Sequence, residues 1–206
     1  MKIQAVIFDI GNVLLTFDYT VAEQEILRQT GRKSPPSQEE LNPLRIDHET
    51  GRIEQTDFVK AVQDAFAHDG PEEHFLDIWS RIFEKNQPMI DWATSLHLRI
   101  PLFLLSNIGS IHHDHIFCEY EFFTTLFRDG VYSYMAGVMK PDPLIFDIAR
   151  HQFRVDPGTT LYIDDLIDNV RSAEAAGFIT HHYDPARHDL FLKKVSTFDF
   201  SSARRA

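Results

Sequence analysis

The stretch Ile3-Gln4-Ala5-Val6-Ile7-Phe8-Asp9, at the start of the chain, indicates the fold class. It is rich in β-branched and aromatic residues and too short for a stable helix, so it predicts a buried strand that ends at an acid. Two later runs, Leu102-Phe103-Leu104-Leu105-Ser106-Asn107 and Thr160-Leu161-Tyr162-Ile163-Asp164-Asp165, repeat this pattern, and a weaker run lies at 178–183. Short, nearly continuous apolar strands of this kind are typical of a parallel sheet buried on both faces.

Helical patterns lie between the later strands. Residues 143–151 and 168–176 have apolar side chains at helical spacing, and Gly177 follows the second segment where a helix commonly ends. Strands that alternate with helices predict an α/β fold, in which a Rossmann-like parallel sheet is flanked by helices.

The segment 17–98 has a different pattern. It contains amphipathic helical patterns, at 21–29, 56–67 and 72–83, and shows no clear strand. We therefore expect an α/β core made of residues 1–16 and 99–206, with residues 17–98 forming a small helical insertion after the first strand.

The composition of the chain excludes several classes of partner. Its 206 residues are 43% hydrophobic, which suffices for a core, and 20 Lys and Arg against 31 Asp and Glu give a net charge of −11. This charge disfavours nucleic acids and anionic membranes as partners. No apolar stretch approaches the roughly 18 residues of a membrane span, and the first residues do not resemble a signal peptide. The single cysteine, Cys118, cannot form an intramolecular disulfide, so we expect a reduced, cytoplasmic setting and a buried thiol.

Polar residues follow the predicted strands where these end. The carboxyl ends of parallel strands meet at one edge of a sheet, so Asp9, Ser106, Asp164 and Asp165 should lie close together. Crowded carboxylates repel one another unless a cation compensates, and oxygen ligands of this kind suit Mg²⁺. The sequence therefore predicts a magnesium site at this edge.

Four stretches in this order resemble the ordered motifs of the haloacid dehalogenase superfamily. They are Phe8-Asp9-Ile10-Gly11-Asn12-Val13, Leu105-Ser106-Asn107, Lys140-Pro141-Asp142-Pro143, and Ile163-Asp164-Asp165 with Asn169. The resemblance covers essentially the whole core, and it implies that the insertion is the C1 helical cap of that superfamily. The form Asp-x-Gly-Asn-Val is similar to the branch of bacterial α-D-glucose-1-phosphate phosphatases, which itself resembles the phosphatase domain of soluble epoxide hydrolase.

The resemblance implies a role for the acids at this edge. Asp9 would be the nucleophile that forms an aspartyl-phosphate, and Mg²⁺ would be held by Asp9, by the backbone carbonyl of Gly11 and by Asp165. Asp164 would orient a metal-bound water or the lysine of the third motif, and Asn169 would fix the loop.

It also implies how a phosphate would be bound. Ser106 and the backbone N–H of Asn107 would donate hydrogen bonds to the transferring phosphoryl group. Lys140 would place a positive charge beside Asp9 and the phosphate.

Gly11 departs from the pattern of these phosphatases, which usually carry an aspartate there as general acid and base. Another group must supply the proton, or the leaving group is good, as in a sugar 1-phosphate, or turnover is slow. Asp47, His48 and Glu49 lie in a segment, 45–53, that we interpret as a polar turn and that resembles the substrate-contacting cap loop of this branch. We expect Asp47 or His48 to touch the substrate.

The leading hypothesis is an Mg²⁺-dependent phosphatase acting on a small phosphorylated metabolite, in particular a sugar phosphate, as a monomer or weak homodimer. One alternative is a 2-haloacid dehalogenase, which would use Asp9 but would not need Asp165 and a metal. A phosphonatase would need a cap lysine, and the candidates are Lys33, Lys60 and Lys85 in polar contexts. The loss of an acid at Gly11 leaves open a weakly active phosphate-binding or regulatory protein. For the cluster His112, His113 and His115 we expect no metal, because no matching ligands follow it.

Overall fold

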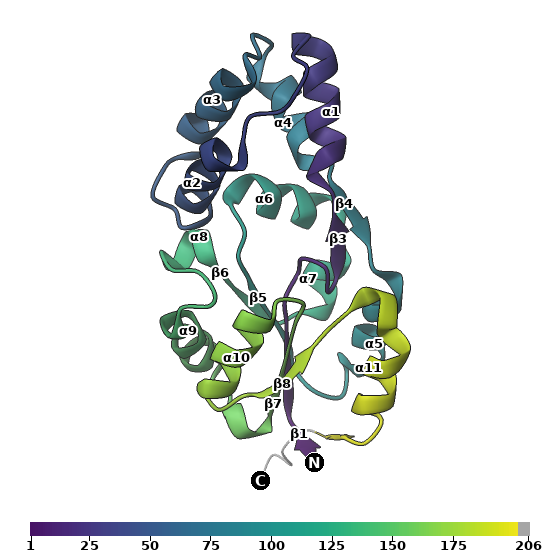
Figure 1. Ribbon diagram of the computed structural model, residues 1–206. Helices are drawn as coiled ribbons and strands as arrows, with labels where there is room; N and C mark the ends of the chain where they lie inside the picture. Colours follow the sequence, from purple (N-terminus) through teal and green to yellow (C-terminus); the bar gives the residue numbers. More distant parts are fainter. Residues whose placement is uncertain (202–206) are drawn as a thin grey trace.

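The computed structural model describes residues 1–201 and contains a central five-stranded parallel sheet (Figure 1). Its strands are β2 (Ala5–Phe8), β5 (Leu102–Ser106), β6 (Asp129–Tyr132), β7 (Thr160–Asp164) and β8 (Ile179–His182). The strand order is β6-β5-β2-β7-β8, and Phe8 of the central strand lies opposite Leu104 and Ile163. The prediction of a parallel α/β fold is confirmed. The edge strand β6 was not predicted, because its sequence Asp-Gly-Val-Tyr lacks an apolar run.

Helices cover both faces of this sheet. Along β2, Val6 and Phe8 point into one apolar core while Ala5 and Ile7 point into the other, as the alternation of a strand requires. The helices that pack in the first core are α5 (Gln87–Leu96), α6 (Ser110–Glu119), α7 (Phe122–Leu126) and α11 (His188–Val195). The second core contains α9 (Pro143–Phe153) and α10 (Ile167–Ala175), and the short α8 (Ser133–Ala136) lies beside it.

Helix α5 packs against the sheet. Its residues fall within the segment 17–98, which we predicted to form the insertion. Met89, Ile90 and Ala93 lie in the same apolar core as Val6 and Phe8. The chain has therefore returned to the sheet before β5 begins.

The insertion forms a second lobe of four helices, at the top of Figure 1. They are α1 (Tyr19–Thr30), α2 (Gln38–Glu49), α3 (Gln55–Phe66) and α4 (Glu72–Ser80). Their apolar sides enclose a separate core around Ile26, Phe58, Val62, Phe75 and Trp79. Three of these helices match the predicted patterns.

Helix α2 was not predicted, because the sequence analysis interpreted residues 45–53 as a turn. The helix begins with a capping box, in which Ser37 and Glu40 satisfy each other's backbone N–H groups, and it tolerates Pro43 in its second turn. Residues 45–49 are therefore helical, and the chain turns from Thr50 onward.

Two short ribbons complete the fold. The antiparallel strands β3 (Leu15–Phe17) and β4 (Phe83–Lys85) join the helical lobe to the sheet, in a region where no strand was expected. The parallel strands β1 (Lys2–Ile3) and β9 (Asp199–Phe200) bring the end of the described chain back beside its start.

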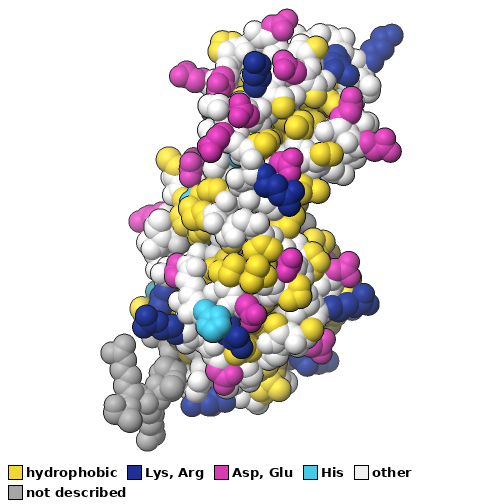
Figure 2. Space-filling view, turned by 90° about the vertical axis from the view of Figure 1, so that its left-hand side faces the viewer, with side chains coloured by type: hydrophobic (Ala, Val, Ile, Leu, Met, Phe, Trp, Pro, Cys, Tyr) yellow, Lys and Arg dark blue, Asp and Glu magenta, His cyan; other side chains and the backbone are white. Residues whose placement is uncertain are grey.

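The surface carries no concentrated basic patch on the face shown in Figure 2, where Lys and Arg side chains are scattered among acidic ones. Apolar side chains gather around the middle of that face. None of the helices within residues 1–201 combines the length and the apolar character needed to cross a membrane. Cys118, which we expected to be buried, is exposed on α6, so that expectation is wrong.

Candidate active site

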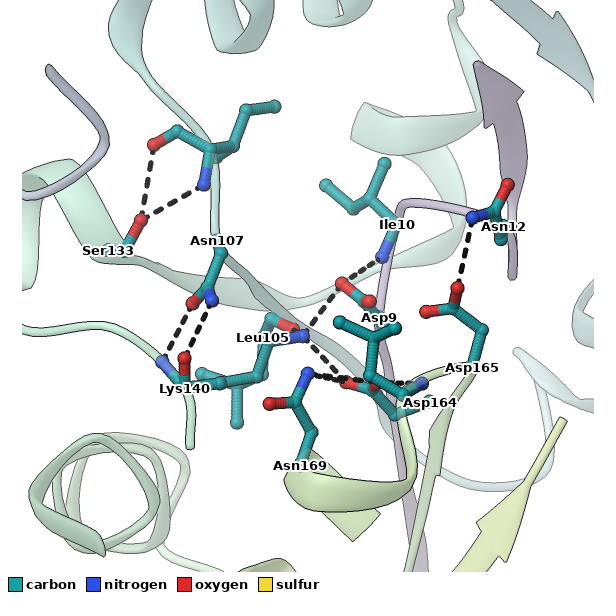
Figure 3. A network of polar contacts seen from close by, with 12 residues as sticks. Asp9, Ile10, Asn12, Leu105, Asn107, Ser133, Lys140, Asp164, Asp165 and Asn169 are labelled. Atoms are coloured by element: carbon teal, nitrogen blue, oxygen red, sulfur yellow. Dashed lines mark hydrogen bonds and ion pairs between the residues drawn. The ribbon is translucent and has the colours of Figure 1, made fainter. Parts of the chain in front are cut away.

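The polar residues that follow the core strands meet at one edge of the sheet, beneath the helical lobe (Figure 3). A cavity of about 270 Å³ opens there. Its lining includes seven of the residues singled out in the sequence: Asp9, Gly11, Ser106, Asn107, Lys140, Asp165 and Asn169. Asp164 lies beneath this floor and is fully buried. The structure thus brings the four motifs together.

Lys140 links two of the acids. Its Nζ lies 2.8 Å from Oδ1 of Asp9 and 2.7 Å from Oδ2 of Asp164, and it also donates to the carbonyl of Leu105 at 2.9 Å. Burial lowers the pKa of Lys140, but the charges of Asp164 and Asp9 outweigh this effect and raise it above its usual value. Lys140 therefore remains a cation inside the protein.

Asp164 accepts hydrogen bonds from three residues in addition to Lys140. The hydroxyl of Tyr162 donates to it, as do the side-chain amide of Asn169 at 3.0 Å and the backbone N–H of Leu166 at 2.8 Å. Burial raises the pKa of Asp164, yet the charge of Lys140 and these hydrogen bonds lower it below its usual value. Asp164 is thus an ionised anchor for Lys140. Tyr162 was not identified from the sequence, where it reads as one more apolar strand residue.

Asp9 and Asp165 face the cavity as acids that the protein compensates only in part. Burial raises the pKa of Asp9, Lys140 opposes this effect, and the charges of Asp164 and Asp165 add to it. Burial also raises the pKa of Asp165, against a 2.9 Å hydrogen bond from the side chain of Asn12. Asn12 has φ 52°, in the left-handed region that asparagine tolerates better than most residues.

These acids form a set of metal-ligating oxygens. Within residues 1–201, the one cluster of three such side chains is Asp9, Asp164 and Asp165, whose ligand atoms lie within 4.8 Å of one another. Because Lys140 and its neighbours already occupy Asp164, Asp9 and Asp165 are the acids left for an ion. Carboxylate oxygens at a cavity wall suit a hard divalent cation.

Hydrogen bonds to Lys140 and Ser133 fix the loop that follows β5. The side-chain amide of Asn107 donates to the carbonyl of Lys140 at 2.9 Å and its oxygen accepts from the Lys140 N–H at 2.8 Å. The next residue, Ile108, donates its N–H to Ser133 at 3.0 Å. Asn107 therefore ties the second motif to the third, and Ser106 is held at the cavity wall.

The helical lobe forms the roof of the cavity. Arg45 and Glu49 of α2 line it together with Tyr19, Phe17, Phe83 and His112. Positions 45 and 49 are one helical turn apart, so they share a face of α2, whereas positions 47 and 48 point elsewhere. The capping box formed by Ser37 and Glu40 was the sequence signal that would have revealed this helix.

Asp47 and His48, the cap residues expected to touch substrate, do not line the cavity. Asp47 lies on the outside of α2, where it pairs with Arg52 at 2.9 Å. His48 is buried and stacks on Phe58 with ring centroids 4.3 Å apart. Burial lowers the pKa of His48 to about 4, so its ring is neutral near pH 7.

The remaining candidates from the sequence also have defined places. His112 lines the cavity, and burial lowers its pKa to about 4 while its Nε2 lies 3.2 Å from the carbonyl of Trp79. Lys33, Lys60 and Lys85 are exposed, and none of the three lines the cavity.

Comparisons with known proteins agree with this geometry. Residues 3–177 match the family of haloacid dehalogenase-like hydrolases, which confirms the resemblance seen in the four motifs. A D-ribitol-5-phosphate phosphatase from Bacteroides thetaiotaomicron is 26% identical over 187 residues, which cover 86% of this chain and 90% of that protein. A phosphatase from Mycobacterium tuberculosis is 24% identical over 200 residues, covering 86% of this chain and 85% of that protein.

A solved structure shows the same fold. It is an HAD family enzyme from Bacteroides thetaiotaomicron in complex with magnesium and inorganic phosphate, with a TM-score of 0.80 and 21% identity. The match covers 92% of this chain and 99% of that one.

Proposed function

The chain belongs to the haloacid dehalogenase-like hydrolase family, and from this premise we propose that it is an Mg²⁺-dependent phosphatase that forms an aspartyl-phosphate on Asp9. The observation that carries the proposal is the placement of Asp9 and Asp165 at one cavity wall, with the Nζ of Lys140 2.8 Å from Asp9. A nucleophilic carboxylate, a second acid and a buried cation are the groups that phosphoryl transfer requires. The names of both phosphatase relatives support this assignment.

Each residue has a part in the reaction. A carboxylate oxygen of Asp9 attacks phosphorus, and Lys140 orients that carboxylate and favours its ionised form against the effect of burial. The hydroxyl of Ser106 and the backbone N–H of Asn107 donate to the phosphoryl oxygens as their charge grows. Asp9, Asp165 and the carbonyl of Gly11 would hold Mg²⁺, which would supply positive charge between the two anions. Asp164 and Asn169 position Lys140 from below.

The substrate we propose is the phosphomonoester of a sugar or a related polyol. The cavity of about 270 Å³ lies just below the usual range for ligand sites, about 300–1,000 Å³, which favours a small substrate. Its floor is polar, and Arg45 and Glu49 in the roof can bind hydroxyl groups. The relative named for D-ribitol-5-phosphate supports this class.

Phosphate release from a panel of sugar and polyol phosphates tests the proposal, with Mg²⁺ or with EDTA. We expect release that needs the metal and that disappears in Asp9→Asn, a variant that keeps the shape of the side chain. Absence of release from every ester by the folded wild-type protein would refute the phosphatase assignment. Chloride release from 2-chloropropionate without metal would favour the dehalogenase instead.

A further inference from the structure

The proposed phosphatase needs a proton donor that its four motifs do not contain. When the P–O bond of an alkyl phosphate breaks, the bridging oxygen takes the electron pair and becomes an alkoxide unless it is protonated. Gly11 has no side chain to give that proton. On the basis of the proposed function, another group must supply the proton that Gly11 cannot give.

A side chain at position 11 would also have to displace the Phe17 ring. A Cβ there would lie 2.9 Å from Cε1 of Phe17. The Phe17 ring packs on Tyr19 and Phe83, with centroids 5.9 and 6.3 Å away, and all three rings line the cavity. The proton donor must therefore reach the cavity from another element.

Glu49 is the carboxylic acid that the helical lobe presents to this cavity. It lies on the last turn of α2, and only 16% of its side chain is exposed, compared with 39% for Asp47 two residues earlier. Arg45 is the nearest charged group, with Nε 3.7 Å from Oε1 of Glu49. Among the acids of the described chain that line the cavity, Glu49 is the one contributed by the roof, while Asp9 and Asp165 belong to the floor.

The end of α2 is anchored against the floor on both sides of Glu49. The His48 ring packs so closely on Gly109 that a Cβ at 109 would lie 2.3 Å from Cδ2 of His48. Gly51 passes the carbonyl of Tyr134, where a Cβ would lie 2.3 Å from the oxygen. Gly109 follows Ser106 by three residues, so these contacts hold Glu49 above the loop assigned to phosphate binding.

We propose that Glu49 is the general acid and base of the reaction. Its protonated carboxyl gives a proton to the bridging oxygen as Asp9 bonds to phosphorus, so an alcohol leaves and Glu49 becomes a carboxylate. Glu49 then takes a proton from the water that attacks the aspartyl-phosphate, which yields inorganic phosphate and restores both acids. Protons and electron pairs balance over the two steps, and no other reactant is needed.

The electrostatic surroundings of Glu49 agree with this role. Burial raises its pKa to about 7, against the opposing charge of Arg45. Besides Arg45, the other titratable groups that line the cavity are Tyr19, which feels the charge of Glu49, His112, and Asp9, Lys140 and Asp165 of the floor. Burial raises the pKa of Tyr19 and lowers that of His112, so both are neutral near pH 7. An acid with a pKa close to the working pH can both give and take a proton.

The test compares leaving groups that differ in their need for a proton. Wild type, Glu49→Gln and the matched variant Asp47→Asn are assayed for kcat/KM on an alkyl phosphate and on p-nitrophenyl phosphate, whose phenolate leaves without protonation. For Glu49→Gln we expect kcat/KM on the alkyl ester to fall on the order of 10²-fold or more, with less than about a threefold change on the aryl ester. Asp47→Asn should change neither value by more than about threefold, because its side chain lies outside the cavity.

The outcomes separate this inference from the proposed function. An equal loss on both esters, or no loss on either, would refute the acid role of Glu49 while the phosphatase assignment stands. If the wild-type protein releases phosphate from no ester of the sugar and polyol phosphate panel and not from p-nitrophenyl phosphate, the phosphatase assignment itself fails and the role of Glu49 fails with it. Circular dichroism of each variant shows that the protein compared is folded.

Discussion

Replacement of Glu49 by glutamine should change how the stability of the protein depends on pH. Burial raises the pKa of Glu49 from its usual value of 4.5 to about 7. The folded state therefore binds the proton more tightly than the unfolded state does. The contribution of Glu49 to the stability of the folded state is therefore complete below pH 4.5, and it is lost as the pH rises to about 7.

The size of the effect follows from this pKa difference. A change from 4.5 to about 7 corresponds to about 3 kcal/mol of unfolding free energy, and at 16% exposure little of it is screened by water. Glutamine keeps the shape and has no charge to bury. The difference in unfolding free energy between Glu49→Gln and wild type should therefore increase by about 3 kcal/mol, in favour of the variant, as the pH rises from 4 to 8.

Urea unfolding of both proteins at a series of pH values measures this difference. Other carboxylates titrate in both proteins, so their effects cancel in the comparison. Asp47→Asn, which removes a more exposed carboxylate from the same helix, serves as the control. A constant difference between Glu49→Gln and wild type would show that the carboxyl has the same pKa in the folded and unfolded states, which would refute the burial argument.

Two further predictions concern contacts that hold the site together. Lys140→Met leaves Asp9 and Asp164 buried without their cation, and in EDTA it should lower the unfolding free energy by about 3–5 kcal/mol in urea titrations; a loss below about 1 kcal/mol would contradict the buried ion pair. Gly51→Ala and Gly31→Ala both place a Cβ at positive φ, but only at Gly51 does it meet a backbone oxygen, at 2.3 Å. Gly51→Ala should therefore be less stable than Gly31→Ala by about 1–3 kcal/mol in urea, and equal losses would argue against close packing of α2 on the core.

The core of the fold could be predicted from the sequence because short stretches of the chain indicate its strands. The strands β2, β5 and β7 are continuous apolar runs that end at polar residues, and chain order then places those ends at one edge. The edge strand β6 was missed because Asp129 and Gly130 are poor strand formers, and its pairing with Leu104 and Leu105 of β5 sets its structure.

The roof of the site was harder to predict because it depends on how the helical lobe packs on the α/β core. Pro43 and the many polar residues of α2 masked a helix that the pair Ser37 and Glu40 indicates. Once the helix is known, Glu49 and Arg45 fall on the same face. That this face turns toward Asp9 follows only from the docking of α2 on the core, which no local pattern encodes.

The contact between Gly11 and Phe17 has a consequence for how such a protein can evolve. Some glycine codons become aspartate codons by one base change, so glycine and the usual acid of the family can be one mutation apart. In this chain the mutation would place a Cβ 2.9 Å from Cε1 of Phe17, so the ring, which is 41% exposed, would have to move. A smaller residue at position 17 would remove this contact. The effect of an acid at position 11 therefore depends on the residue at position 17, so the two positions are coupled epistatically.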